Sequence, residues 1–197
     1  MIPPAVLSQA LRTAAPFPGG PTFDLFCQAI ASAVVTWLPT GVNLVGVTTG
    51  VIGVGTVTGT LFFVGTPAIV LAAIGGSLRG QNAPLLATVL SVGLTTGLAG
   101  LTYVGVSAGV GVGTDLSRVV SANVPLLSTT LRTTHAAMCA AQGGTGATTV
   151  PGFYEAIAGA IGAVVMTGGT LPPTGVVAPT GPLGPSSSVG TSTAIPV

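Results

Sequence analysis

Formal charge is the scarcest property of this sequence. Its 197 residues contain four Arg, no Lys and three carboxylates, so only 4% are charged, against about 25% in ordinary globular proteins. Mean hydropathy is +0.88. A lone soluble chain normally hydrates its surface with far more ionic groups. The composition therefore predicts that much of the surface faces lipid or other protein subunits.

Several functional classes are excluded by these shortages. The four Arg are scattered, and phosphate binding needs a basic patch, so no nucleic-acid partner is expected. The opening Met1-Ile2-Pro3-Pro4 lacks the basic and apolar regions of a secretory signal. Two distant cysteines make no disulfide framework. Cys27 and Cys139 are interpreted as buried thiols, although the sequence leaves a pairing between them open.

Catalytic and metal-binding groups are equally sparse. The only carboxylates are Asp24, Asp115 and Glu155, and we expect them at helix starts or in ion pairs such as Asp115 with Arg118. His135 and Cys139 lie four apart on a predicted helix, but two ligands are too few for zinc. The glycine clusters lack the spacing of a dinucleotide loop and the Lys of a Walker loop. The sequence predicts no enzyme, cofactor or metal.

An internal repeat organises the chain. GVNLVGVTTGV at 41–51 aligns with GLTYVGVSAGV at 100–110, an offset of 59 with six of eleven positions identical. Omission of Ile52 then aligns GVGT at 53–56 with GVGT at 111–114. A third, degenerate copy is indicated by Phe153–Ala160, which resembles Phe26–Ala33, followed by Thr174–Val177. The fold class expected is α+β, as tandem helix-strand repeats with Gly/Val-rich strands and small-residue helices.

The expected organisation follows from this repeat. Helices are predicted at 4–14, 23–38, 67–79, 83–98, 123–140 and 152–167. The corresponding domains are 1–22 (N-terminal helix and Pro/Gly entry), 23–81 (unit 1), 82–150 (unit 2), 151–182 (degenerate unit 3) and 183–197. The last of these is rich in Pro, Gly, Ser and Thr, and we expect an extended tail that a partner holds in place.

Strict alternation divides the predicted strands into a valine face and a bare glycine face. We expect the valines to form a sheet-facing core that packs subunits together: Val45, Val47, Val51, Val54, Val104, Val106, Val110 and Val112. We expect close contact with a neighbouring element at the glycines: Gly105, Gly109, Gly111 and Gly113. Because Ile52 is an extra residue in a pattern of period two, a β-bulge is predicted at Val51-Ile52.

Assembly is favoured over a membrane. The most apolar run, Leu61–Ile74, contains Pro67 and is shorter than the ~20 residues that span hydrocarbon. Loops show no Lys/Arg asymmetry, and Trp37 is the only Trp. A membrane-active, holin-like or pilot protein remains the alternative, and only that alternative involves a membrane.

The Pro-Gly-Gly-Pro entry at 18–21, the helix Phe26–Trp37 and the two GVGT segments resemble small virion structural proteins of tailed bacteriophages, especially myoviruses. This resemblance implies a tail, baseplate or capsid-associated component present in many copies, with no enzymatic residues. The function expected is a non-enzymatic structural subunit of a virion, assembled in the host cytoplasm. Its partners would be copies of itself and other virion structural proteins.

Overall fold

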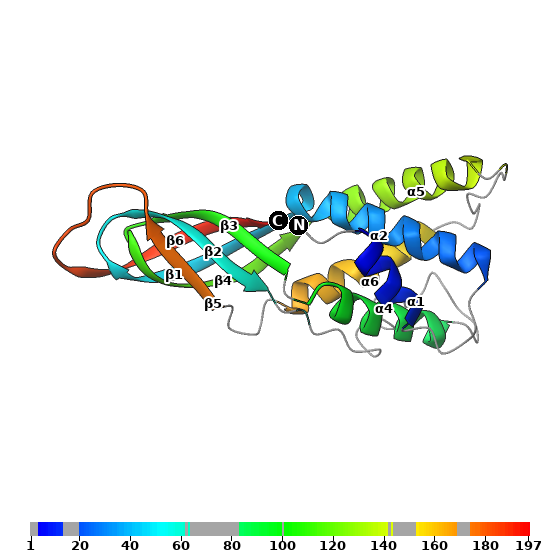
Figure 1. The fold of residues 1–197 in the computed structure, drawn as a ribbon, viewed down its shortest axis with the longest axis horizontal. Coiled ribbons are helices and arrows are strands. Elements are labelled where there is room, and N and C mark those ends of the chain that lie inside the picture. Colours follow the sequence, from blue (N-terminus) through cyan, green and yellow to red (C-terminus); the bar gives the residue numbers. More distant parts are fainter. Residues whose placement is uncertain are drawn as a thin grey trace.

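The chain combines a β-barrel with a group of helices, as the computed structural model shows (Figure 1). The structure describes residues 4–13, 20–61, 63, 83–99, 101–141, 143, 153–168 and 174–197. These residues form five helices and six strands. The barrel and the helices lie at opposite ends of an elongated molecule (Figure 1). The mixed α+β class expected from the sequence is confirmed.

The helices occupy the expected positions. They are α1 (Pro4–Thr13), α2 (Pro21–Gly41), α4 (Ala83–Gly97), α5 (Val124–Ala141) and α6 (Phe153–Gly168). Each matches its predicted range closely, while the helix predicted at 67–79 lies outside the described residues. Asn123 caps α5, because its Oδ1 accepts a 3.1 Å hydrogen bond from the backbone N–H of Leu126. Asp24 lies in the first turn of α2, as expected.

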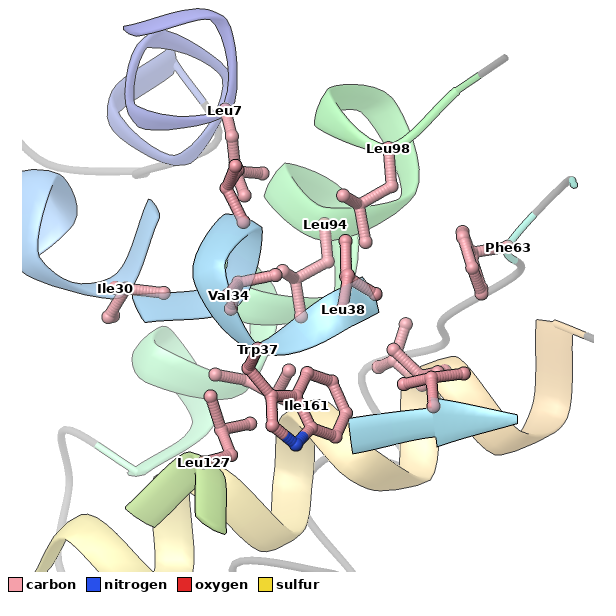
Figure 2. Packing of buried hydrophobic residues seen from close by; sticks show 14 of the residues in the cluster. Leu7, Ile30, Val34, Trp37, Leu38, Phe63, Leu94, Leu98, Leu127 and Ile161 are labelled. Atoms are coloured by element: carbon pink, nitrogen blue, oxygen red, sulfur yellow. The ribbon is translucent and has the colours of Figure 1, made fainter. Parts of the chain in front are cut away.

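The core of the helical end is built around Trp37 of α2. Figure 2 shows side chains from all five helices gathered there, among them Leu7 of α1, Leu94 of α4, Leu127 of α5 and Ile161 of α6. All are fully buried or nearly so. The indole N–H of Trp37 donates a 2.8 Å hydrogen bond to the carbonyl oxygen of Asn123. This bond satisfies the one polar atom of Trp37 and ties α2 to the start of α5.

The strands close into a barrel in the order β1-β4-β5-β2-β3-β6. Their bounds are β1 (Val42–Val51), β2 (Val54–Leu61), β3 (Leu101–Ala108), β4 (Val112–Ala122), β5 (Thr174–Pro179) and β6 (Ser187–Pro196). All six neighbouring pairs are antiparallel. The strands β1 and β2 are separated by two strands in either direction, as are β3 and β4 and also β5 and β6, so the two strands of each of these pairs lie on opposite sides of the barrel.

The expectation of an extended tail at 183–197 is wrong. Most of this segment is β6, which pairs with β1 on one side and β3 on the other. The composition of this segment did not indicate a strand, because Ser, Thr and Gly dominate in place of valine. In a narrow barrel, small side chains are what the inward positions require, so a strand here need not be rich in bulky apolar residues.

The far end of the barrel is closed by three crossing turns, at 52–53, 109–111 and 180–186. Gly111 donates its N–H to the carbonyl of Val51, Ile52 donates to Ser186, and Gly184 donates back to Ile52, each at 2.8 Å. The prediction of a β-bulge at Val51-Ile52 is therefore wrong. The extra residue lies in a turn between two strands, where it shifts no pairing, and the register irregularity of β1 lies instead at Asn43/Leu44.

Candidate functional site

The outer wall of the barrel exposes valine, and this reverses one expectation. The valines expected in a sheet-facing core point outward: Val45, Val47, Val54, Val104, Val106 and Val112 are 36–58% exposed. Val51 is half-buried, and Val110 alone of the set is fully buried. Alternation correctly groups residues that share a face. It does not tell which face is inside.

The glycine face points into the barrel, as its close contacts explain. A Cβ on Gly105 would lie 2.0 Å from the carbonyl oxygen of Thr193, and one on Gly113 would lie 2.0 Å from that of Thr49. A Cβ on Gly111 would lie 3.2 Å from the Cα of Gly53, at the crossing turns. The atoms that lie close to these glycines belong to strands and turns of the chain itself.

Gly109 has a different requirement. Its φ is +92°, in the left-handed region that side chains disfavour, and it lies in the turn between β3 and β4. The nearest atom to a Cβ at this position would be the Cα of Gly190, at 3.2 Å. Gly109 is therefore needed both for the turn and for the approach of β6.

The wall carries almost no charge. Among the residues of the six strands, Asp115 is the only carboxylate and Arg118 the only basic side chain. Asp115 points inward and is 1% exposed, while Arg118 points outward. The expected pairing of these two is wrong, because residues three apart on a strand lie on opposite faces. The exterior is therefore mainly valine and threonine, with a few other uncharged residues such as Leu116 and Ile195, and a single guanidinium.

The barrel interior holds a small polar cluster. Oδ2 of Asp115 accepts a 2.7 Å hydrogen bond from the hydroxyl of Tyr103, and Oδ1 accepts a 2.5 Å bond from Ser192. Ser192 and Ser117 lie 3.0 Å apart, oxygen to oxygen. Burial, followed by the bond to Asp115, raises the pKa of Tyr103 well above its usual value near 10. Both carboxylate oxygens are satisfied by neutral donors, so this cluster is a structural network.

His135 and Cys139 lie in the helical end, not in a metal site. Nδ1 of His135 is 3.0 Å from the hydroxyl of Tyr154, and burial lowers the pKa of His135. Cys27 and Cys139 are both buried, as interpreted from the sequence, and they do not form a disulfide with each other. Burial raises the pKa of Cys27 to about 11. Within the described ranges, no three or more His, Cys, Asp or Glu residues gather closely enough to hold a metal.

The outer wall is also hollowed. A groove with a volume of about 850 Å³ lies across β2, β3, β6 and β1, and its outward-facing lining includes Val45, Val104, Val106, Thr193 and Ile195. These side chains offer apolar contact area and threonine hydroxyls but no charge. Chemically, the wall can bind an uncharged surface and has no group to activate a substrate.

One described helix, Pro21–Gly41, is long and apolar enough to cross a membrane by length and composition. More than half of its most apolar window is buried inside the fold, around Trp37. Its apolar character thus has an explanation within the helical core.

No protein-family model matches the chain, and no curated protein or solved structure is significantly similar to it. The structure itself supplies what the sequence reading missed. Exposed Val176 on β5 and Val189 on β6 (59% and 72% exposed) complete the apolar wall. Val176 lies in Thr174–Val177, the segment predicted to end the degenerate third copy, whereas Val189 precedes Gly190 in the segment at 183–197 that was expected to be a tail.

Proposed function

We propose that the protein is a non-enzymatic structural subunit of a large viral assembly, in which the barrel wall binds neighbouring subunits. The observation that carries this is the wall of exposed, uncharged side chains on all six strands. Outward residues such as Val47, Val106, Val176 and Val189 are between 49% and 72% exposed. Contiguous apolar surface of this kind marks interaction sites. The resemblance to phage virion proteins supplies the setting, as a tail, baseplate or capsid-associated component.

Burial of this wall supplies the driving force. Apolar surface removed from water contributes about 25 cal/mol per Å², and permanent interfaces are large and apolar. The wall offers no charge that would have to be desolvated except Arg118. Apart from Asp115, which points into the barrel, the other formal charges of the described residues, Arg12, Asp24, Arg132 and Glu155, lie on helices. The barrel end would therefore bind partners while the helical end carries most of the charge.

We infer further that the chain is three copies of one helix-helix-strand-strand unit. The first comprises α1, α2, β1 and β2; the second contains α4, β3 and β4; the third comprises α5, α6, β5 and β6. The strand order supports this. Suppose that β1 is replaced by β3, β3 by β5 and β5 by β1, and that β2 is replaced by β4, β4 by β6 and β6 by β2. The order of the strands around the closed barrel is then unchanged.

The registers support the same three-fold relation. Each central glycine of the odd strands pairs with two even strands: Gly46 with Ser117 and Ser192, Gly105 with Ala194 and Val57, and Gly175 with Gly59 and Asp115. Cyclic exchange of the strands carries each set onto the next. It matches Gly46 with Gly105, as the sequence alignment does. It also aligns three copies of Val-Gly-Thr, at 54–56, 112–114 and 189–191.

The helices agree with the strands. Leu7-Ser8 and Leu11-Arg12-Thr13 of α1 recur as Leu127-Ser128 and Leu131-Arg132-Thr133 of α5. The two leucines and the serine are buried in both copies. In each case this first helix packs on the second helix of its own unit, α1 on α2 and α5 on α6. It also packs on the second helix of one other unit, α1 on α4 and α5 on α2.

A charge series on the exposed wall tests the function. The triple variant Val47→Lys, Val106→Lys, Val176→Lys changes only exposed side chains, so we expect it to fold. A matched control adds the same charge to exposed positions of the helical end: Thr36→Lys, Thr133→Lys, Ala137→Lys. Sedimentation velocity in detergent-free buffer should show wild type and control as multimers and the wall variant as a folded monomer.

Two outcomes would count against the proposal. A wild-type chain that sediments as a folded monomer would show that the wall tolerates water. Wild-type protein that floats with added phosphatidylcholine vesicles, and does so less when the wall is charged, would favour the membrane-active alternative. Circular dichroism of all three proteins separates loss of association from loss of fold.

A further inference from the structure

The exposed apolar side chains recur in equivalent sets of three. Under the cyclic relation of the strands, Val47, Val106 and Val176 occupy one equivalent position and are 49%, 58% and 59% exposed. Val54, Val112 and Val189 occupy a second and are 53%, 36% and 72% exposed. The barrel thus presents the same small apolar feature three times around its axis.

We propose, on the basis of the proposed function, that this surface is enclosed by three identical subunits of one partner protein, related by a three-fold axis that runs along the barrel. A surface repeated three times around an axis offers equal contacts to three copies of one partner. A single second copy of this chain would cover one of the three equivalent parts of the wall and leave the other two parts exposed. Three-fold closure covers all of it, and closed symmetry is the usual solution for identical subunits.

The charge pattern defines the chemistry of the partner. Arg118 is the only charge directed outward from the strands, and its equivalents in the other two units are Thr60 and Ile195. Because the partner subunits are identical, an acidic residue placed to pair with Arg118 would occur three times and be buried unpaired twice. Buried unpaired charge is costly. The partner surface is therefore uncharged and apolar where it meets the valines, and we expect it to leave the exposed Arg118 guanidinium in contact with water, because Arg118 would otherwise itself be a buried unpaired charge.

Photocrosslinking in the assembled particle tests this. The photoreactive residue p-benzoylphenylalanine is placed in the full chain at Val47, Val106 or Val176, one position per variant, and a fourth variant carries it at exposed Ala137 of α5 as the control. After irradiation, mass spectrometry identifies the crosslinked peptide. We expect the three barrel variants to give the same peptide of the same partner in comparable yield. The Ala137 variant should not give that peptide.

The possible results separate the two proposals. Crosslinks from one barrel position only, or to different proteins from different positions, would overturn the three-fold partner and leave a structural role intact. Crosslinks between copies of this chain would do the same. Absence of any protein crosslink from all three barrel positions would overturn the proposed function as well. If a p-benzoylphenylalanine variant fails to enter particles, the three variants Val47→Thr, Val106→Thr and Val176→Thr are used in its place. The incorporation of each Thr variant into particles is measured relative to wild type. Unequal losses among the three variants would contradict three equivalent contacts.

Discussion

The hydroxyl of Tyr103 on β3 donates a 2.7 Å hydrogen bond to Oδ2 of Asp115, which lies across the barrel interior on β4. The two strands are not neighbours in the sheet, so this bond joins opposite parts of the wall. The Tyr103 side chain also fills the space over two inward glycines, because a Cβ on Gly59 or Gly175 would lie within 2.4 Å of it. One side chain thus both fills the narrow interior and satisfies the buried carboxylate.

Tyr103→Phe removes that bond while keeping the ring. We expect the free energy of unfolding to fall by about 1–3 kcal/mol, because a buried acceptor is left without one of its donors. Urea denaturation measures the change. In the background Asp115→Leu, where the acceptor is absent, the same substitution should cost much less. Equal losses in the two backgrounds would show that the hydrogen bond contributes nothing.

The contacts of two glycines predict opposite effects of the same substitution. Gly113→Ala places a Cβ 2.0 Å from a backbone oxygen of β1, so we expect a substantial loss of stability. Gly159→Ala in α6 meets nothing within 4 Å and replaces a poor helix former with the best one, which should stabilise by up to about 1 kcal/mol. Thermal denaturation followed by circular dichroism measures both. A fall in melting temperature for both variants, or for neither, would contradict this packing.

The sequence predicted what local patterns determine. The five described helices lie where apolar spacing and caps such as Asn123 placed them, and β1 to β4 lie where valine alternates with glycine. Alternation could not say which face of these strands is buried. Bulky residues usually face a core, but the interior of this six-stranded barrel takes many small residues, such as Ser107, Ser117 and Ser192, beside a few larger ones such as Tyr103 and Val57. Barrel closure depends on pairings such as β1 with β6, more than a hundred residues apart, which no local pattern contains.

β6 provides a direct test of that reversed orientation. Val189 is 72% exposed and Ala194 is 6% exposed, on the same strand and on opposite faces. Val189→Lys should leave the melting temperature nearly unchanged. Ala194→Lys forces an unpaired charge into the barrel interior, so we expect it to prevent folding or to lower stability by several kcal/mol. Similar behaviour of the two variants would mean that β6 is not an integral strand.

His135 predicts a loss of stability in acid. Burial lowers its pKa in the folded state, so the unfolded chain binds the proton more readily. Stability from this group is complete above the unfolded pKa near 6.5 and declines as pH falls below it, toward the folded pKa. His135→Gln retains a polar partner for the Tyr154 hydroxyl but does not titrate. Urea midpoints measured from pH 7.5 down to pH 5, a range chosen around that value, should fall more steeply for wild type; parallel curves would assign the acid sensitivity elsewhere.

The three-unit organisation predicts that the chain tolerates circular permutation at a unit boundary. β4 leads into α5 through Asn123 alone. In the proposed repeat β6 and α1 are the corresponding strand and helix, so Val197 joined directly to Met1 leaves four residues, Val197 and 1–3, between Pro196 and Pro4 for the same connection. A permutant with this joint, opened between Gly65 and Thr66 in the link from β2 to α4, should fold with a circular dichroism spectrum like that of wild type. The control has the same joint but is opened between Val104 and Gly105, which divides β3, and we expect it not to fold. Failure of the first permutant alongside the control would contradict the equivalence of the three units, because that equivalence predicts that the joint closes without an added linker.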